Sequence, residues 1–384
     1  MKLILSAFLF SFSVLHAEIP EFQPGQPWPD RDGIHINAHG GGMLFHKGTY
    51  YWCGEHKVEG DAGNYAQVGV SMYSSKNLHH WKNEGIILPV SEDPQSDIVK
   101  GSIIERPKVI FNRKTGRFVM WFHLELKGRG YTAARSGVAV ADKVTGPYQY
   151  LGSFRPNAGV WPANVPDENK QAPTAEQLAD LAKTRMPGNS VPASAKNLLY
   201  RRDHAGGQMA RDMGLFVDDD GKAYHIYASE ENSTLHISLL TDDYLKPAGQ
   251  YIRIFPGAFN EAPAMFKHKG KYFLITSGCT GWKPNRARLA SADHIFGPWT
   301  DLGDPCIGPD AQTKTTFESQ STFVLPVQGK PGAFIYMGDR WRPSNPIDAT
   351  HVWLPVQFDK DGKPFLEWMD KWDLDFFDAV STRS

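Results

Sequence analysis

The stretch FNEAPAMFKHKGKYFLITSG, from Phe259 to Gly278, decides how this chain folds. A carboxylate, Glu261, stands just before Ala-Pro, and an apolar run follows it. A basic turn ending in Gly270 then leads into the aromatic and β-branched run KYFLIT. Glycine supplies the positive φ of a tight turn, and aromatic and β-branched residues suit a pleated surface, so the stretch predicts a β-hairpin.

The same pattern occurs four more times along the chain. Each copy has an apolar strand, a polar turn containing glycine, and a second strand rich in aromatic residues. The five copies are HGGGMLFHKGTYYWCGE from His39, ERPKVIFNRKTGRFVMWFH from Glu105, DMGLFVDDDGKAYHIYA from Asp212, EAPAMFKHKGKYFLITS from Glu261 and QSTFVLPVQGKPGAFIYMGD from Gln320. A polar residue therefore opens the first strand of every copy.

A second pair of strands is expected behind each of the first four hairpins. The segments that indicate it are VGVSMYSSKNLHHW (68–81), SGVAVADKVTGPY (136–148), LHISLLTDDYL (235–245) and RARLASADHIFGPW (286–299). A hairpin with two outer strands is one blade of a β-propeller. For the fifth blade, HVWLPVQFDKDGKPFLEW (351–368) can supply the outer strands, with the N-terminal part of the mature chain closing the ring. The sequence thus predicts an all-β fold, a five-bladed β-propeller; an irregular β-sandwich is the alternative.

The polar residues that open the hairpins are expected to meet. The first strand of each blade lines the propeller axis, so its opening residue lies at one end of the central channel. Packing alone would select small or apolar groups there, because an unpaired buried charge is costly. A pocket with three carboxylates therefore indicates a functional site, formed by His39, Glu105, Asp212, Glu261 and Gln320.

The overall composition excludes some classes of partner. The chain has 384 residues, 41% of them hydrophobic, which is ample for a large core. Its 41 Lys and Arg residues against 42 Asp and Glu residues give a net charge of −1. Since there is no basic excess, we expect no binding to nucleic acid or to an anionic membrane.

The first residues, MKLILSAFLFSFSVLHAE, have the pattern of a signal peptide. Lys2 is basic, Leu3 to Leu15 is apolar, and Ala17 is a suitable cleavage residue. The run is too short to span a membrane, and a buried first strand is the other interpretation. We expect residues 1–17 to be removed and residues 18–384 to form one secreted or periplasmic domain, most simply a monomer.

A long insertion, at about 155–208, separates the second and third repeats. It is rich in Pro and Ala, and PTAEQLADLAKT predicts a short helix, with Thr174 as N-cap and Gln177 as its capping-box partner. A flap over the pocket and a solvated decoration are both open interpretations.

The three cysteines, Cys53, Cys279 and Cys306, match no zinc motif. We interpret them as packing residues, with Cys279–Cys306 as a candidate disulfide, which export would permit.

Carboxylates around one pocket are the groups that cleave glycosidic bonds. A protonated acid delivers a proton to the leaving oxygen, and an opposing group activates water or attacks directly. Glu261, flanked by an apolar strand, suits the acid, with Glu105 and Asp212 tuning its pKa or binding sugar hydroxyls. Trp52, Trp121 and Trp282 could stack on sugar faces or belong to the core.

The chain resembles glycoside hydrolase family 43, five-bladed propellers that act on arabinans, xylans and galactans. The motifs that carry the resemblance are INAHGGG, YYWCGE, ERPKVIFN, RDMGLFVDDDGKAY, EAPAMFK, SGCTGW and ESQSTFV. They are similar to the branch that contains exo-β-1,3-galactanases (galactan 1,3-β-galactosidases), and to a neighbouring branch with arabinofuranosidases and galactofuranosidases.

The resemblance implies roles for individual residues. Glu261 matches the general acid and Glu105 the carboxylate that modulates the acid's pKa. Sugar contacts are implied or expected for Glu55, Asp212, Tyr131, Thr280, His39 and Trp282.

The catalytic base is where this chain departs from most of the family. The family places an aspartate at the start of the first blade, where this chain has His39-Gly40. The galactanase branch shares that absence, and there a glutamine matching Gln320 is thought to hold the nucleophilic water. Glu318, two residues away, is an alternative base, since residues i and i+2 share a face of a strand.

The resemblance implies an exported, exo-acting, inverting glycoside hydrolase that releases galactose from β-1,3-galactan or an arabinogalactan-type polysaccharide. An α-L-arabinofuranosidase or β-D-galactofuranosidase of the same family is the alternative, and a non-catalytic carbohydrate-binding propeller is a third hypothesis. The expected partner is a polysaccharide or oligosaccharide. No cofactor and no metal ligand set is expected, although family members often carry a structural cation in the channel.

Overall fold

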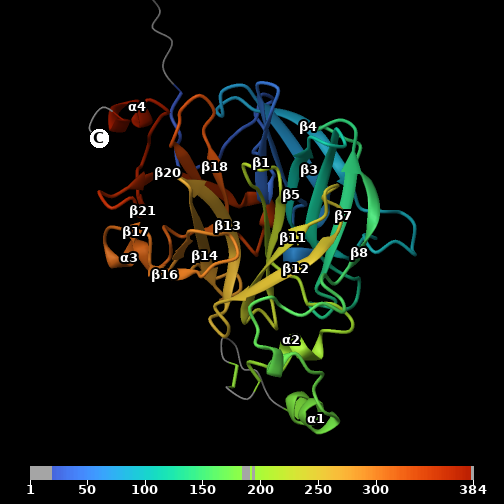
Figure 1. The fold of residues 1–384 in the computed structure, drawn as a ribbon. Helices are drawn as coiled ribbons and strands as arrows, with labels where there is room; N and C mark the ends of the chain where they lie inside the picture. Colours follow the sequence, from blue (N-terminus) through green and yellow to red (C-terminus); the bar gives the residue numbers. More distant parts are fainter. Residues whose placement is uncertain (1–19, 184–190, 193–194, 382–384) are drawn as a thin grey trace, which may run out of the picture.

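The computed structural model describes residues 20–183, 191–192 and 195–381, and these residues confirm the five-bladed β-propeller (Figure 1). Every blade is an antiparallel sheet in which neighbouring strands are consecutive in sequence. Blade 1 consists of β1 (His39–His46), β2 (Thr49–Lys57), β3 (Gln67–Ser75) and β4 (Lys82–Pro89). Blade 2 consists of β5 (Ile103–Asn112), β6 (Arg117–Glu125), β7 (Arg135–Ala141) and β8 (Gln149–Phe154). Blade 3 consists of β9 (Met213–Val217), β10 (Ala223–Ser229), β11 (Thr234–Leu240) and β12 (Pro247–Ile254). Blade 4 consists of β13 (Asn260–His268), β14 (Lys271–Gly278), β15 (Arg288–Ala292) and β16 (Thr300–Gly303).

The fifth blade is formed by β18 (Gln320–Pro326), β19 (Phe334–Arg340), β20 (Thr350–Phe358) and β21 (Pro364–Glu367). A short strand, β17 (Cys306–Ile307), adds to its outer edge in parallel with β21. The stretch 351–368 therefore supplies the outer strands, as predicted. In blades 1 to 4, each quoted outer segment supplies only the third strand, and the fourth strand begins within two residues of its end.

The turn of the opening hairpin is formed by two residues. His268 pairs with Lys271, and Lys269 and Gly270 between them have φ values of 48° and 81°. Two successive positive φ angles define the type I′ turn, whose twist matches that of the flanking strands. Lys47 and Gly48, with φ values of 46° and 74°, make the same turn in blade 1.

The five first strands surround the axis. Going round the ring, β1 lies beside β5, β5 beside β9, β9 beside β13, β13 beside β18, and β18 again beside β1. Side chains between blades form the core. Trp52 and Trp121 are 1% and 0% exposed in these clusters, so the sugar stacking considered for them is corrected to core packing.

The segment before β1 closes the ring between blades 5 and 1. Phe22 and Trp372 exchange two backbone hydrogen bonds, of 2.6 and 3.1 Å. The ring of Phe22 packs with Trp28 and Trp353 in the core cluster that joins these blades.

The insertion carries the predicted helix, α1 (Ala175–Lys183), and a short second one, α2 (Leu199–Arg202), which Figure 1 shows together at one side of the propeller. The capping box is confirmed, since the backbone N–H of Thr174 donates to Gln177 Oε1 (3.0 Å) and that of Gln177 donates to Thr174 Oγ1 (3.1 Å). The proposed disulfide is not formed, because all three cysteines are free.

Candidate active site

A bulge interrupts three of the inner strands directly after the residue that opens them. The register shifts just after His39, Glu105 and Glu261. The next residue in each case, Gly40, Arg106 or Ala262, has a φ of 59°, 56° or 54°. Non-glycine residues with a left-handed backbone are strained, and they occur preferentially at functional sites.

A carboxylate from a neighbouring blade accepts the N–H of each of these left-handed residues. Asp339 accepts from Gly40 (2.7 Å), Glu55 from Arg106 (2.9 Å), and Asp212 from Ala262 (3.2 Å). The blades are thus joined at the mouth of the channel by charge-assisted hydrogen bonds, which are stronger than neutral ones.

Four carboxylates meet in one pocket: Glu55, Glu105, Asp212 and Glu261. The cavity has a volume of about 250 Å³, and its other lining residues are Asn64, Arg106, Tyr131, Gly281, Trp282, Gln320 and Trp341. The predicted convergence of opening residues thus holds for blades 2 to 5.

Glu261 is a carboxyl whose pKa is raised to near neutral pH. Burial raises its pKa to about 7, and the negative charges of Asp212 and Glu105 act in the same direction. A hydrogen bond from Cys279 and the positive charge of Arg106 oppose this shift. A carboxylic acid with this pKa can donate a proton near neutral pH.

Glu105, in contrast to Glu261, is ionised at neutral pH. Burial alone would raise its pKa, but His123, whose Nδ1 lies 2.8 Å from Glu105 Oε2, outweighs burial and lowers that pKa to about 2. Tyr131 also donates its hydroxyl to Glu105 Oε1, at 2.6 Å. His123 contacts Glu125 through Nε2 at 2.9 Å, and the two carboxylates raise the pKa of His123 to about 9.

Glu55 forms an ion pair with Lys57. It lies 2.7 Å from Lys57 Nζ and is almost fully buried. Burial outweighs the charge of Lys57 and raises the pKa of Glu55 above its usual value.

Arg106 connects three blades at the floor of the pocket. Its guanidinium lies 2.9 Å from Asp212 Oδ2, donates to the backbone oxygen of Ser321 (3.1 Å), and donates to Gln320 Oε1 (2.5 Å). It also lies over the ring of Trp341, 5.3 Å from the centroid.

Gln320 is held in one orientation by these contacts. Its Oε1 accepts from Arg106 and from Trp341 Nε1 (2.9 Å), and its Nε2 donates to Ser277 Oγ (2.9 Å). Because guanidinium and indole N–H groups only donate, the oxygen must face them. One N–H of the amide is then left to orient a further acceptor.

Aromatic rings form one wall of the pocket. Trp282 and Trp341 meet edge to face with centroids 5.6 Å apart. Tyr131 also lines the pocket, and its hydroxyl oxygen accepts a hydrogen bond from Asn64.

Two residues with expected sugar contacts, His39 and Thr280, lie outside this pocket. His39 is fully buried and stacks on His351, so its expected contact with sugar is corrected to packing in the interior. Thr280 does not line the pocket; its hydroxyl donates to the backbone oxygen of Lys283, while its neighbours Gly281 and Trp282 do line it.

Glu318, the alternative base, is corrected as well. It lies in a turn before β18 with a φ of 59°, so the argument from alternate positions on a strand does not apply to it. Its carboxylate is 3.6 Å from Arg340 and 69% exposed, and it lines an adjoining groove instead.

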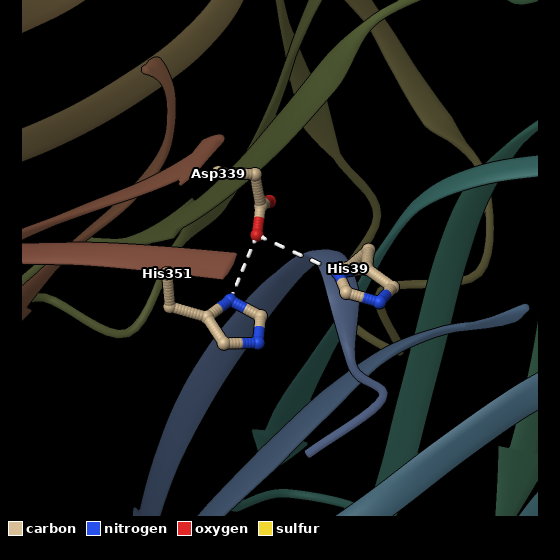
Figure 2. Close-up of side chains that lie close together, drawn as sticks. All are labelled: His39, Asp339 and His351. Carbon is tan, nitrogen blue, oxygen red and sulfur yellow. Dashed lines mark hydrogen bonds and ion pairs between the residues drawn. The ribbon is translucent and has the colours of Figure 1, made fainter. Parts of the chain in front are cut away.

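Two groups of side chains bring possible cation ligands together: His39 with Asp339 and His351, and Glu105 with His123 and Asp212. In the second group His123 is protonated at neutral pH, so its imidazole does not bind a cation in that state. Figure 2 shows the carboxylate of Asp339 between the two imidazoles of the first group. His351 Nδ1 is 2.9 Å from Asp339 Oδ1, whereas His39 Nδ1 is 3.9 Å away. Burial lowers the pKa of His39 to about 4, so its imidazole is neutral, as a metal ligand must be.

The insertion does not reach the pocket in the described part of the chain. None of the residues 155–183, 191–192 and 195–208 lines it. Instead the insertion docks on blade 3, where Asn164 bonds the backbone of Arg253 and Tyr200 lies under the guanidinium of Arg253.

Sequence reasoning missed Arg106, Trp341 and Asn64. The repeat alignment held a signal for Arg106, because it occupies the same position as Gly40 and Ala262, directly after an opening residue. Trp341 follows the second strand of its blade, as Trp282 follows that of blade 4. Asn64 lies in an irregular loop, for which the repeat gives no signal.

A five-bladed propeller whose axial pocket combines a carboxyl of raised pKa, further acidic side chains and an aromatic wall defines a carbohydrate-cleaving enzyme. The family model described as glycosyl hydrolases family 43 matches residues 194–364. A family 43 β-1,3-galactosidase, solved with galactodeoxynojirimycin, is 51% identical over 92% of this chain and 100% of its own, with a TM-score of 0.86. The chain therefore belongs to glycoside hydrolase family 43, and it is a glycoside hydrolase.

Two further solved structures mark the range of similarity. An exo-β-1,3-galactanase from Phanerochaete chrysosporium, solved with β-1,3-galactotriose, is 33% identical over 92% of this chain and 68% of its own, with a TM-score of 0.72. An α-L-arabinofuranosidase from Clostridium thermocellum is 16% identical over 86% of this chain and 93% of its own, with a TM-score of 0.54, and shares the fold. Among curated proteins, a search found no match.

Proposed function

We propose that this protein is an exo-acting, inverting glycoside hydrolase that releases galactose from β-1,3-galactan or an arabinogalactan-type polysaccharide. The observation that supports it most is the split in protonation within one pocket. The pKa of Glu261 is raised to about 7, whereas that of Glu105 is lowered to about 2. Such a pair supplies an acid and a fixed negative charge at the same pH.

In this mechanism Glu261 protonates the leaving glycosidic oxygen. The neighbouring charges of Asp212 and Glu105 keep its proton in place until the bond breaks and then stabilise positive charge on the sugar ring. Tyr131, Asn64 and Glu55 line the pocket where sugar hydroxyls would bind, and Trp282 offers an apolar face.

Gln320 is proposed to position the attacking water by donation. Its Oε1 already accepts two hydrogen bonds, so that oxygen cannot also carry a proton, as an imidic acid tautomer would require. The remaining Nε2 hydrogen can orient a water, and the proton that this water loses passes to a carboxylate of the pocket. Direct attack by water inverts the anomeric centre.

Exo action and the choice of galactose have separate support. A cavity of about 250 Å³ is smaller than the roughly 300–1,000 Å³ of pockets for drug-sized ligands, so it suits a terminal sugar better than a polymer passing through. The relatives above 30% identity act, by their names, on β-1,3-linked galactose. The solved α-L-arabinofuranosidase, which would favour the furanosidase alternative, shares only the fold with this chain.

We also propose export, a monomeric state and chemistry without a cofactor. The predicted signal peptide, residues 1–17, lies outside the described residues, and N-terminal sequencing of the mature protein tests it. No helix in the described part of the chain is long and apolar enough to cross a membrane.

The test of function is hydrolysis of β-1,3-galactan and β-1,3-galactobiose beside nitrophenyl α-L-arabinofuranoside and β-D-galactofuranoside, with Glu261→Gln as the inactive control. We expect galactose from the first two substrates. Proton NMR during the first turnovers should show the α-anomer forming from the β-linkage. Release of arabinose or galactofuranose alone would replace this proposal with the furanosidase, and an initial β-anomer would overturn inversion.

A further inference from the structure

Two donors from separate segments converge on one oxygen of Glu261. Asn232 Nδ2 lies 2.9 Å from Glu261 Oε1, and Cys279 Sγ lies 3.0 Å from the same atom. Asn232 lies in the turn between β10 and β11, and Cys279 directly follows β14. Among the described residues, none makes a hydrogen bond to Oε2.

The orientation of Asn232 is set from behind. Arg211 Nη1 donates to Asn232 Oδ1 at 3.2 Å, and since a guanidinium only donates, the amide nitrogen must face Glu261. The same arginine donates to the backbone oxygen of Tyr131 at 2.7 Å, which holds it in place. Asn232 has a φ of 64°, a backbone conformation that asparagine tolerates better than most residues.

We propose that Asn232 and Cys279 are positioning residues that fix Oε1 of Glu261 and leave Oε2 as the oxygen that delivers the proton to the substrate. The inference rests on the proposed function, in which Glu261 is the general acid. An oxygen that accepts two hydrogen bonds has no free lone pair for the proton, so the proton stays on Oε2. The carboxyl group is thereby prevented from rotating so that its two oxygens change places. Such a rotation would point the proton away from the substrate half of the time.

The two donors act on the pKa of Glu261 in the direction opposite to burial and to the neighbouring carboxylates. Burial, Asp212 and Glu105 favour the protonated form, and Arg106 favours the ionised form. A donor to Oε1 likewise favours the ionised form. Burial and the charge of Glu261 raise the pKa of the Cys279 thiol to about 12, so it remains a neutral donor over the whole working range.

The test compares Cys279→Ala, Cys279→Ser and Asn232→Ala, with Cys306→Ala as the control thiol outside the pocket. The pH dependence of kcat/KM on β-1,3-galactobiose is measured for each. Because the active form of Glu261 is protonated, loss of a donor should move the basic limb to higher pH, by roughly half to one unit. The Cys279→Ala and Asn232→Ala enzymes should also lose kcat several-fold, whereas Cys279→Ser, which still donates, and Cys306→Ala should follow the wild type.

A second measurement separates this proposal from the proposed function. Titration of the Glu261 carboxyl by ¹³C NMR, assigned with Glu261→Gln, reports its pKa without turnover. A raised pKa in Cys279→Ala supports positioning even if galactan is not cleaved. Coincident titration curves for wild type, Cys279→Ala and Cys279→Ser overturn the proposal, and this comparison still decides it if Asn232→Ala does not fold.

Discussion

Glu261 and Glu105 open equivalent strands, yet their surroundings shift their pKa values in opposite directions. Glu105 faces a histidine that is positively charged at neutral pH, whereas Glu261 faces Asp212 and neutral donors. The partner on the next strand therefore lowers the pKa of Glu105, whereas burial and Asp212 raise that of Glu261. His123 stands opposite Glu105 in the register, and Ser277 stands opposite Glu261.

Glu261→Gln should abolish cleavage of natural β-1,3-galactosides while sparing activated ones. The amide keeps the shape of the carboxyl but cannot give a proton to the leaving oxygen, which typically costs ~10²–10⁴-fold. A nitrophenolate leaving group needs little protonation, so nitrophenyl β-galactoside should suffer much less. Equal losses on both substrates would assign Glu261 to binding or to activation of water instead.

Asp212→Asn and Glu105→Gln should both move the basic limb of the pH profile to lower pH. Both negative charges raise the pKa of Glu261, so their removal lowers it, and the protonated, active form then disappears earlier as pH rises. Asp212 contributes more than Glu105, so Asp212→Asn should give the larger shift. Profiles of kcat/KM against pH measure this, and a limb that moves upward in either variant contradicts the assignment of Glu261 as the acid.

The sequence indicated these carboxylates because each opens a repeat, but it could not indicate their protonation. The pKa of Glu105 depends on His123, which lies eighteen residues later and on the neighbouring strand. The fixed orientation of Gln320 depends on Arg106, more than two hundred residues earlier. Side chains that meet only through the closed ring leave no local pattern.

The bulge that opens β1 has a tight fit at Gly40. A Cβ added there would lie 2.3 Å from Glu55 Oε1, and the φ of 59° is already unfavourable for other residues. Because Arg106 and Ala262 adopt nearly the same φ at the equivalent positions, the lack of space beside Glu55 is what restricts this strand start to glycine.

Gly40→Ala should lower the free energy of unfolding by roughly 1–3 kcal/mol, the usual cost of strained backbone, and more if Glu55 is displaced. Gly48→Ala is the matched control, because its φ is 74° but nothing lies within 4 Å of the added Cβ. Urea unfolding of both variants measures the difference. Equal losses would mean that the contact with Glu55 has no energetic weight.

The insertion was predicted to carry a capped helix, and its local capping box is a signal that sequence does hold. Its docking on blade 3 was not predictable, since it depends on Arg253 and Glu230. Arg253 donates to both oxygens of Glu230, at 2.5 and 2.7 Å, and to the backbone oxygen of Lys196 at 3.0 Å. Glu230 is fully buried.

Arg253→Ala should destabilise the protein by about 3–5 kcal/mol, because it leaves a buried carboxylate without its main partner. Burial alone would raise the pKa of Glu230, but Arg253 and His236 lower it, so this carboxylate stabilises the fold above its unfolded pKa. That contribution is lost as pH falls through the lower folded pKa, and the variant should lose this acid dependence.

Thermal and urea unfolding at several pH values measure both effects. Arg201→Ala, which removes contacts to backbone oxygens within the insertion, is the control and should change stability little. Substrate affinity of the folded variant should be unchanged, since none of these groups lines the pocket. A changed KM would favour the flap interpretation of the insertion.

The ring of blades is closed from both ends of the described chain. The sequence predicted that an N-terminal segment closes it, and the structure places Phe22 against Trp372 for this purpose. The five hairpins were predictable because each is local. The closing contacts were not, because the two partners are separated by 350 residues.

Phe22→Ala should open this closure and lower the free energy of unfolding by about 3–5 kcal/mol, as for other buried phenylalanines. Phe22 is 2% exposed among Trp28, Trp353 and Trp372, whereas Ile34, on the same segment, is 61% exposed, so Ile34→Ala should change stability by less than about 0.5 kcal/mol. Tryptophan fluorescence during urea unfolding reports the closure directly, because three indoles surround the deleted ring. Because the pocket draws on every blade, Phe22→Ala should also lose activity at a lower urea concentration than the wild type. If stability and activity of Phe22→Ala match those of Ile34→Ala, the blades hold the ring closed without this segment.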